Sequence, residues 1–213
     1  MVKTTLYLLR HGQSIANLDD KMIGHTDLDL TELGYLQAER TAEALRDVDF
    51  CAIYSSDLVR ARNTAKYNAQ LHKLDIITDE QLREIYFGDW ENVEKTKLAA
   101  ESSDLYVGGW RENFGTFRCP NGESVVQTAD RIYDALLKIA KRHEGKTVLV
   151  TFHAAAIRAL WGKILDLPPQ KWAKETWFPS NASYTIVEYD GNKILPVSFS
   201  NDAHLGDLVT RVK

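Results

Sequence analysis

The sequence has few of the features that mark secreted, metal-binding or membrane-spanning proteins. Its only cysteines, Cys51 and Cys119, lie far apart and have no paired or histidine-rich spacing. This argues against a disulfide framework and a structural zinc site, and it favours a reducing cytoplasm. The first apolar stretch runs only from Leu6 to Leu9, too short for a signal core or a membrane span. We therefore expect a cytoplasmic protein without a membrane partner, metal or cofactor.

Charge of one sign is not in large excess either. The formal net charge is −4, which gives no overall attraction to nucleic acid or to anionic membranes. An anionic ligand must then be held by a local cluster of cationic side chains. Only five prolines occur in 213 residues, and no repeat or change of composition divides the chain. We expect a single domain over residues 1–213, long enough to bury one large core.

Short apolar stretches and helical patterns alternate along the chain. Stretches with the composition of buried strands are Thr5–Leu9, Ala52–Tyr54, Ile76–Thr78, Val148–Thr151 and Tyr184–Tyr189. Thr31 can cap a helix whose Ala38, Ala42 and Leu45 share a face, and Ser124 with Gln127 forms a capping-box pattern before a second amphipathic helix. The alternation predicts an α/β three-layer sandwich, a mostly parallel central sheet with helices on both faces.

One segment breaks this alternation. Residues at about 91–122 mix charged side chains with several aromatic rings and have three glycines before Pro120. We interpret this segment as an inserted lid. Its rings, among them Trp110, Phe114 and Phe117, favour either a leaving group with some apolar surface or simple packing of the insertion.

Polar side chains follow the expected strands where a ligand site of an α/β sheet should lie. Arg10 and His11 follow the first strand, Arg60 lies about one turn into a helix after the second, and His153 follows the fourth at the start of another helix. Taken alone, each of these residues is better interpreted as a buried histidine or as a solvated arginine. We interpret Arg62 as a solvated arginine. Their convergence at neighbouring strand ends favours a site for an anion, helped by the free N–H groups of the helix at His153.

Glu84 follows the third strand and is flanked by Ile85, Phe87 and Trp90. Such neighbours would desolvate the carboxyl, raise its pKa and keep it protonated near neutral pH, as a general acid requires. An exposed loop glutamate is the alternative.

Taken together, these residues resemble the histidine phosphatase, or phosphoglycerate mutase-like, superfamily. The resemblance spans nearly the whole chain and rests on motifs in a fixed order: Arg10-His11-Gly12-Gln13-Ser14 with Asn17, Gly24, Leu30-Thr31-Glu32-Leu33-Gly34, Ser55-Ser56 before Arg60-Ala61, Leu82-Arg83-Glu84, Gly122-Glu123-Ser124, His153 five residues before Arg158, and Asn201 with His204-Leu205.

The resemblance implies a role for each central residue. His11 is the nucleophile that forms a phosphohistidine, Arg10, Arg60 and His153 bind the phosphoryl oxygens, and Glu84 donates the proton to the leaving group. The residue chemistry agrees, because His11 must be neutral to attack and two nearby arginines lower its pKa. The implied partner is a small phosphorylated substrate, with inorganic phosphate as product.

The same resemblance places Asn17, Ile23 and the backbone near Gly24 and Ala154 along the pocket. The family often has glycines after its second histidine, whereas this chain has Ala154 and Ala155, whose methyl groups narrow the space for substrate. Phe152, just before His153, is expected in the core.

Several functions remain open. A metal-independent, acid-type phosphomonoesterase is favoured over a cofactor-dependent phosphoglycerate mutase. Ile85 and Phe87 stand where mutases of the superfamily typically have an arginine and a tyrosine. The lid of those mutases also carries adjacent arginines that hold the substrate carboxylate, whereas Arg111 and Arg118 are well separated here. A catalytically silent phosphate-sensing or protein-binding module is a third reading. A metal phosphatase is disfavoured, because the sequence lacks the clustered Asp and His ligands that a two-metal site needs. The physiological substrate and the oligomeric state, including a homodimer, are left open.

Overall fold

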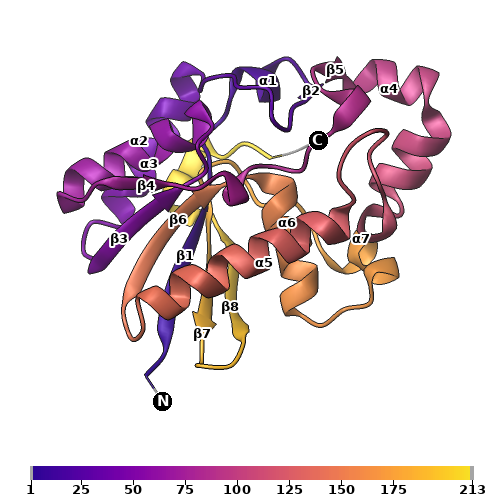
Figure 1. Ribbon diagram of the computed structural model, residues 1–213. Helices are drawn as coiled ribbons and strands as arrows, with labels where there is room; N and C mark the ends of the chain where they lie inside the picture. The colour runs from indigo at the N-terminus through magenta and orange to yellow at the C-terminus, as the bar shows by residue number, and fades with distance from the viewer. Residues whose placement is uncertain (1, 212–213) are drawn as a thin grey trace.

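A six-stranded sheet in the order β4-β3-β6-β1-β7-β8 forms the centre of the computed structural model, which describes residues 2–211 (Figure 1). Its strands are β1 (Thr4–Arg10), β3 (Phe50–Ser55), β4 (Ile76–Thr78), β6 (Thr147–Phe152), β7 (Tyr184–Tyr189) and β8 (Ile194–Asn201). The first four run parallel, whereas β7 and β8 are antiparallel. The predicted α/β class with a mostly parallel sheet is confirmed.

Helices cover both faces of this sheet. On one face lie α5 (Val125–Arg142) and α6 (Ala154–Ile164), and on the other α2 (Glu32–Ala44) and α3 (Val59–His72) (Figure 1). Shorter helices are α1 (Ile15–Leu18), α4 (Lys95–Glu101) and α7 (Trp172–Glu175). The predicted caps are confirmed: the Thr31 side chain accepts the N–H of Gly34, and Ser124 and Gln127 form the capping box that begins α5.

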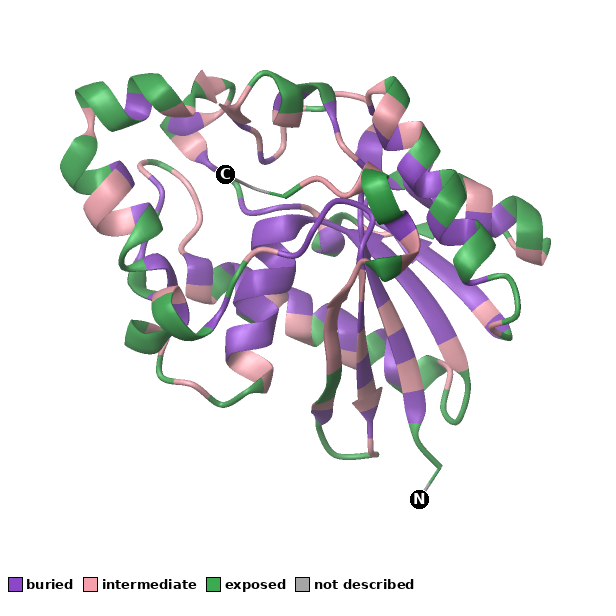
Figure 2. Ribbon diagram, turned by 180° about the vertical axis from the view of Figure 1, so that it is seen from behind, coloured by how far each residue is buried: buried purple, intermediate pink, exposed green. Residues whose placement is uncertain are grey.

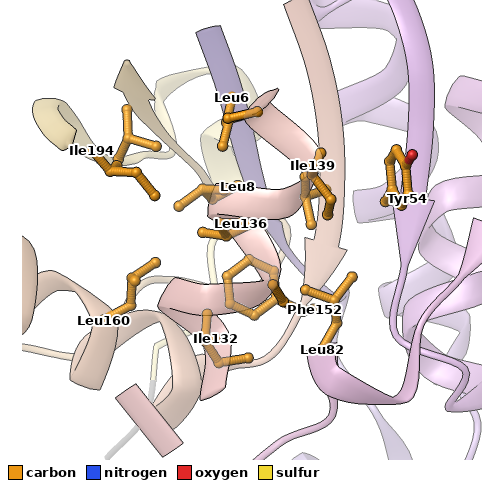
Figure 3. Packing of buried hydrophobic residues seen from close by; sticks show 14 of the residues in the cluster. Leu6, Leu8, Tyr54, Leu82, Ile132, Leu136, Ile139, Phe152, Leu160 and Ile194 are labelled. Atoms are coloured by element: carbon orange, nitrogen blue, oxygen red, sulfur yellow. The ribbon is translucent and has the colours of Figure 1, made fainter. Parts of the chain in front are cut away.

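The core follows from the alternation of side chains along the strands. Leu6 and Leu8 of β1 pack with Ile132 and Leu136 of α5, and Phe152 lies in the same cluster, as expected (Figure 3). The opposite face buries a second cluster with Leu9, Leu149 and Ile53 of the strands against Leu45, Ala65 and Ala69. Figure 2 shows mostly buried residues along the strands in the middle of the sheet, and both buried and exposed residues along the helices.

Three parallel strands end level with one another, and this positions the site. In the register, Arg10 of β1 pairs with Phe152 of β6, and Ser55 of β3 pairs with Thr151 of β6. The N–H of His11 donates to the carbonyl of Phe152 at 3.0 Å, just beyond the strand ends. The residues that follow β1, β3 and β6 therefore lie side by side.

The structure corrects two expectations about strands. Ile76–Thr78 forms a strand at the predicted position, but it is the edge strand β4 and is largely exposed, because only one neighbour covers it. Tyr184–Tyr189 alternates between buried and half-buried positions, as an antiparallel strand does. The strand β8 and a second, two-stranded sheet of β2 (Lys21–Met22) and β5 (Val93–Glu94) are not predicted from the sequence.

The segment predicted as a lid contains β5, α4, a π-helical stretch Asp104–Arg111 and a short turn Phe114–Thr116. Its aromatic rings pack against one another and against α5 and α6 in a cluster of their own: Trp110 contacts Phe114 edge-on, and Phe117 stacks on Trp90. Across residues 2–211, none of the helices has both the length and the apolar character needed to span a bilayer.

Candidate active site

A pocket opens at the carboxyl ends of β1, β3 and β6 and brings together most of the predicted site residues. Those that line it are Arg10, His11, Asn17, Ile23, Arg60, Glu84 and Ala154. His153 lies directly beneath this lining, fully buried, with its ring centroid 5.2 Å from that of His11. Gly24 is not among the residues that line the pocket, and its carbonyl accepts a hydrogen bond from Nη2 of Arg60.

His11 is held as a neutral imidazole with one free nitrogen. Its Nδ1 lies 2.7 Å from the carbonyl oxygen of Gly12, which can only accept a hydrogen bond, so Nδ1 carries the hydrogen. Burial, together with the positive charges of Arg60 and Arg10, places the pKa of His11 well below its ordinary value. The lone pair of Nε2 is therefore available as a nucleophile.

Gly12, directly after His11, is required for packing rather than for access of a ligand. A Cβ atom at Gly12 would lie 2.3 Å from the carbonyl oxygen of Gly34 in α2. The glycine thus permits close packing of the loop against α2, and not a close approach of a ligand to the backbone.

Two buried arginines supply the positive charge. Arg10 donates from Nη1 to the carbonyl of Pro179 at 2.6 Å, while its buried Nε has no protein partner. Burial lowers the pKa of Arg10 to about 10, so the guanidinium stays charged at neutral pH. Arg60 is the second residue of α3, not one turn in, and its guanidinium is fixed by carbonyls of the loop at residues 24–26. Arg62 is exposed, as expected.

His153 precedes α6 and contributes a second unpartnered nitrogen. Its Nε2 lies 2.9 Å from the hydroxyl oxygen of Ser56, whereas its buried Nδ1 has no partner. Burial and the charge of Arg60 lower the pKa of His153 well below its usual value. A neutral His153 whose Nε2 accepts the Ser56 hydroxyl proton carries its hydrogen on Nδ1, and this makes Nδ1 a free donor.

Glu84 is buried against the start of α6. Its Oε2 accepts the N–H of Ala155 at 2.9 Å, and its Oε1 accepts those of Ala156 at 2.8 Å and Ile85 at 3.0 Å. Burial raises the pKa of Glu84 above its ordinary value, although these three donors and Arg60 oppose the shift. The desolvation predicted from Ile85, Phe87 and Trp90 agrees with this, since all three are buried.

The start of α6 is therefore not free for a ligand in the way the sequence suggested. The N–H groups of Ala155 and Ala156 already bind the Glu84 carboxyl, which takes the place expected for an outside anion. Ala154, the first residue of the helix, remains at the pocket wall.

Asn17 is oriented by its neighbours. Its Oδ1 accepts hydrogen bonds from the N–H and hydroxyl of Ser14 and from the amide of Asn181, each at 3.1 Å. With the oxygen committed in this way, the amide nitrogen Nδ2 is the group left to donate toward the pocket that Asn17 lines.

The sequence analysis did not identify Lys21, Met22, Lys95 or Phe178 as part of the pocket wall. The further lining residues are Ser14, Lys21, Met22, Phe87, Lys95, Trp110, Ala155 and Phe178. Lys21 and Lys95 come from the small sheet and the start of α4, and Lys95 pairs with Asp20 at 2.6 Å. No local pattern marked these lysines, because the two strands that bring their segments together, β2 and β5, are about 70 residues apart in the sequence. Trp110 thus both packs against other rings of the segment predicted as a lid and lines the pocket.

Other motif residues of the resemblance serve the framework. His204 bonds to the hydroxyl of Thr41 at 2.9 Å, and Arg158 donates to the hydroxyl of Thr176 at 3.1 Å. Glu123 pairs with Arg131, whose Nη1 also donates to the carbonyl of Arg83 next to Glu84. Within residues 2–211, no three histidine, cysteine or acidic side chains gather as metal ligands would.

Comparison with known proteins supplies a family and several relatives. The family model of the histidine phosphatase superfamily (branch 1) matches residues 6–202. A Salmonella choleraesuis protein named "Probable phosphoglycerate mutase GpmB" is 33% identical over 194 residues, which cover 89% of this chain and 87% of that protein.

Two solved structures are similar throughout. YhfR of Bacillus stearothermophilus has a TM-score of 0.88 and 31% identity, covering 95% of this chain and 99% of that one. A mycobacterial glucosyl-3-phosphoglycerate phosphatase with VO3 has a TM-score of 0.85 and 30% identity, covering 92% and 98%.

Proposed function

Since the chain belongs to the histidine phosphatase superfamily, we propose that it is a metal-independent phosphomonoesterase that hydrolyses a small phosphorylated metabolite through a phosphohistidine on His11. The observation that carries the proposal is the meeting, in one pocket, of a neutral nucleophile, two buried arginines and a carboxyl with a raised pKa. A nucleophile, an anion clamp and a proton donor are the groups that this reaction needs.

In the first step, the Nε2 lone pair of His11 forms a bond to phosphorus while the bond to the leaving oxygen breaks. The bond from Nδ1–H to the Gly12 carbonyl stabilises the positive charge that develops on the ring. Arg10 and Arg60, with the free Nδ1 donor of His153, stabilise the phosphoryl oxygens. The Glu84 proton passes from Oε2, the oxygen with a single backbone donor, to the leaving oxygen.

In the second step, the now ionised Glu84 accepts a proton from water as the water oxygen attacks phosphorus. The bond to His11 breaks, inorganic phosphate forms, and Glu84 is protonated again for the next cycle. The proposal uses one carboxyl as acid and then as base, which its raised pKa favours.

The outer wall of the pocket indicates which kind of leaving group it could accept. Lys21 and Lys95 offer positive charge there, and Trp110 and Phe178 offer apolar surface. We propose that the leaving group carries an anionic or strongly polar group beside a small apolar surface. The product is inorganic phosphate, and a reducing cytoplasm is the proposed location.

A phosphoglycerate mutase is the second candidate, favoured by the name of the Salmonella relative. Against it, Arg111 is exposed outside the pocket, and Arg118 is bonded to the carbonyl of Gly122 and the side chain of Gln127. Neither arginine is therefore placed to hold a second anionic group of a phosphoglycerate.

The test is phosphate release from p-nitrophenyl phosphate in the presence of EDTA. Wild type should be active and His11→Ala inactive, while His143→Ala, a histidine bonded to Tyr54 away from the pocket, should match wild type. Activity that survives His11→Ala, or that EDTA removes, contradicts the proposal. Phosphoryl transfer to phosphoglycerate that is faster than release to water would make the protein a mutase.

A further inference from the structure

Glu91, just outside the pocket, is surrounded by hydrogen-bond donors. Its Oε1 accepts the N–H groups of His25 at 2.9 Å and Phe87 at 3.1 Å. Its Oε2 accepts the N–H groups of Gly24 at 3.2 Å and Thr26 at 3.1 Å, and the Thr26 hydroxyl at 2.7 Å. A carboxylate has about four lone-pair sites, so these five donors leave neither oxygen of Glu91 unpaired.

The same loop holds Arg60 with its carbonyl groups. Arg60 donates from Nη2 to the carbonyl of Gly24 at 2.7 Å and from Nη1 to that of Thr26 at 3.0 Å. The loop at residues 24–26 thus directs its N–H groups to Glu91 and its carbonyls to the guanidinium. A side chain at Gly24 is excluded, because its Cβ would lie 2.1 Å from the Ile85 carbonyl oxygen.

We infer that Glu91 is a positioning residue, which fixes the loop at residues 24–26 so that its carbonyls hold the Arg60 guanidinium against the phosphoryl site. This inference rests on the proposed function for the role of Arg60. The loop also contacts the general acid, since the ring Nε2 of His25 lies 3.0 Å from the carbonyl oxygen of Glu84. Glu91 therefore links the anion clamp to the segment that carries Glu84.

Only a carboxylate satisfies this arrangement. Each oxygen of Glu91 faces at least two donors, so glutamine in either orientation directs its NH₂ group at N–H groups and leaves them unpaired. Burial alone would raise the pKa of Glu91, but the donors outweigh burial and the pKa lies below its usual value. The side chain is thus ionised whenever the enzyme works near neutral pH.

The experiment measures binding of inorganic phosphate by calorimetry to wild type, Glu91→Gln, Arg60→Ala and the double variant. Glu91→Gln should weaken binding by about tenfold to a hundredfold, the usual effect of disturbing a charged hydrogen bond. In the Arg60→Ala background the same change should alter binding by less than about twofold, because Glu91 acts through Arg60. Asp89→Asn, an exposed carboxylate two residues away that bonds to Asn121, should match wild type.

Equal weakening in both backgrounds, or none in the wild-type background, overturns the inference. If Glu91→Gln does not fold, Thr26→Val removes one donor to Glu91 and should weaken phosphate binding about threefold in the wild-type background only. Wild type that binds phosphate but hydrolyses no ester would defeat the proposed function and leave the positioning role intact. Hydrolysis of esters together with additive effects of Glu91→Gln and Arg60→Ala on phosphate binding would support the proposed function and overturn the positioning role.

Discussion

Replacing Glu84 by glutamine removes the proposed proton donor while keeping the size of the side chain. The glutamine oxygen can still accept the N–H groups of Ala156 and Ile85, which bond to Oε1 in the wild type. Its NH₂ group then faces the N–H of Ala155, which loses its acceptor. The loss of that single bond costs about 1–3 kcal/mol if the N–H stays buried.

The effect on catalysis should depend on the leaving group. General acid catalysis contributes about 10²–10⁴-fold, so kcat for an alkyl phosphate should fall by that factor in Glu84→Gln. A p-nitrophenolate leaves without needing the proton, and the loss in its first step should be much smaller. Burst kinetics with p-nitrophenyl phosphate will separate release of nitrophenol from hydrolysis of the phosphohistidine, which should be slow because Glu84 is also the base.

The same variant tests the direction of the Glu84 pKa shift through stability. The folded-state pKa lies above the ordinary value of 4.5, so between these two pH values the folded state holds a proton that the unfolded state has lost. Wild type should therefore lose stability relative to Glu84→Gln as pH rises above about 4.5, by at most about 1.4 kcal/mol per pH unit. Urea unfolding of both proteins from pH 4 to pH 7 measures this difference.

Two results would refute the reasoning. Equal losses of kcat with alkyl and p-nitrophenyl phosphates, with no accumulation of phosphoenzyme, would mean that Glu84 does not transfer the proton. A stability difference that does not change with pH would mean that the carboxyl titrates alike in the folded and unfolded states.

Three further predictions use the same geometry. Because the pKa of His11 is depressed, the acid limb of kcat/KM should lie below pH 6.5, and a limb at or above that value would contradict a neutral nucleophile. Ser56→Ala removes the partner of His153 Nε2 and should weaken vanadate inhibition about threefold to tenfold, as measured by competition; unchanged inhibition would exclude the tautomer argument. Lys95→Gln should raise KM about fivefold for phosphomonoesters with a carboxylate, yet less than twofold for neutral ones, and an equal rise for both would point to loss of the Lys95–Asp20 pair instead.

The fold and the centre of the site could be predicted because their signals are local. Buried strands are recognised from short apolar runs, and neighbouring parallel strands that end level bring the residues after them together. For this reason His11 and His153 lie close together, although they are 142 positions apart in the sequence. The family resemblance is confirmed by the match over residues 6–202.

The segment at about 91–122, which we predicted to be a lid, could be recognised as irregular, but its structure could not be described in detail. Its segment has no helical or alternating pattern, and it forms a π-helical stretch whose side chains follow neither period. Sequence reasoning left open whether the rings pack or face the substrate. Phe114 and Phe117 are buried in the aromatic cluster of this segment, whereas Trp110 is both buried there and part of the pocket wall.

The sequence predicts the correct direction of the pKa shift of Glu84, but only part of its surroundings. Flanking apolar residues predicted desolvation, but nothing in the sequence indicated that the backbone of Ala155 and Ala156 would bind the carboxyl. Those donors favour the ionised form, so burial has to outweigh them for the pKa to rise. In the proposed mechanism, a phosphoryl dianion bound beside Arg10 would add a like charge near the same helix start and raise this pKa further. We therefore expect substrate binding to favour the protonated form of Glu84 at the moment when the leaving oxygen needs the proton.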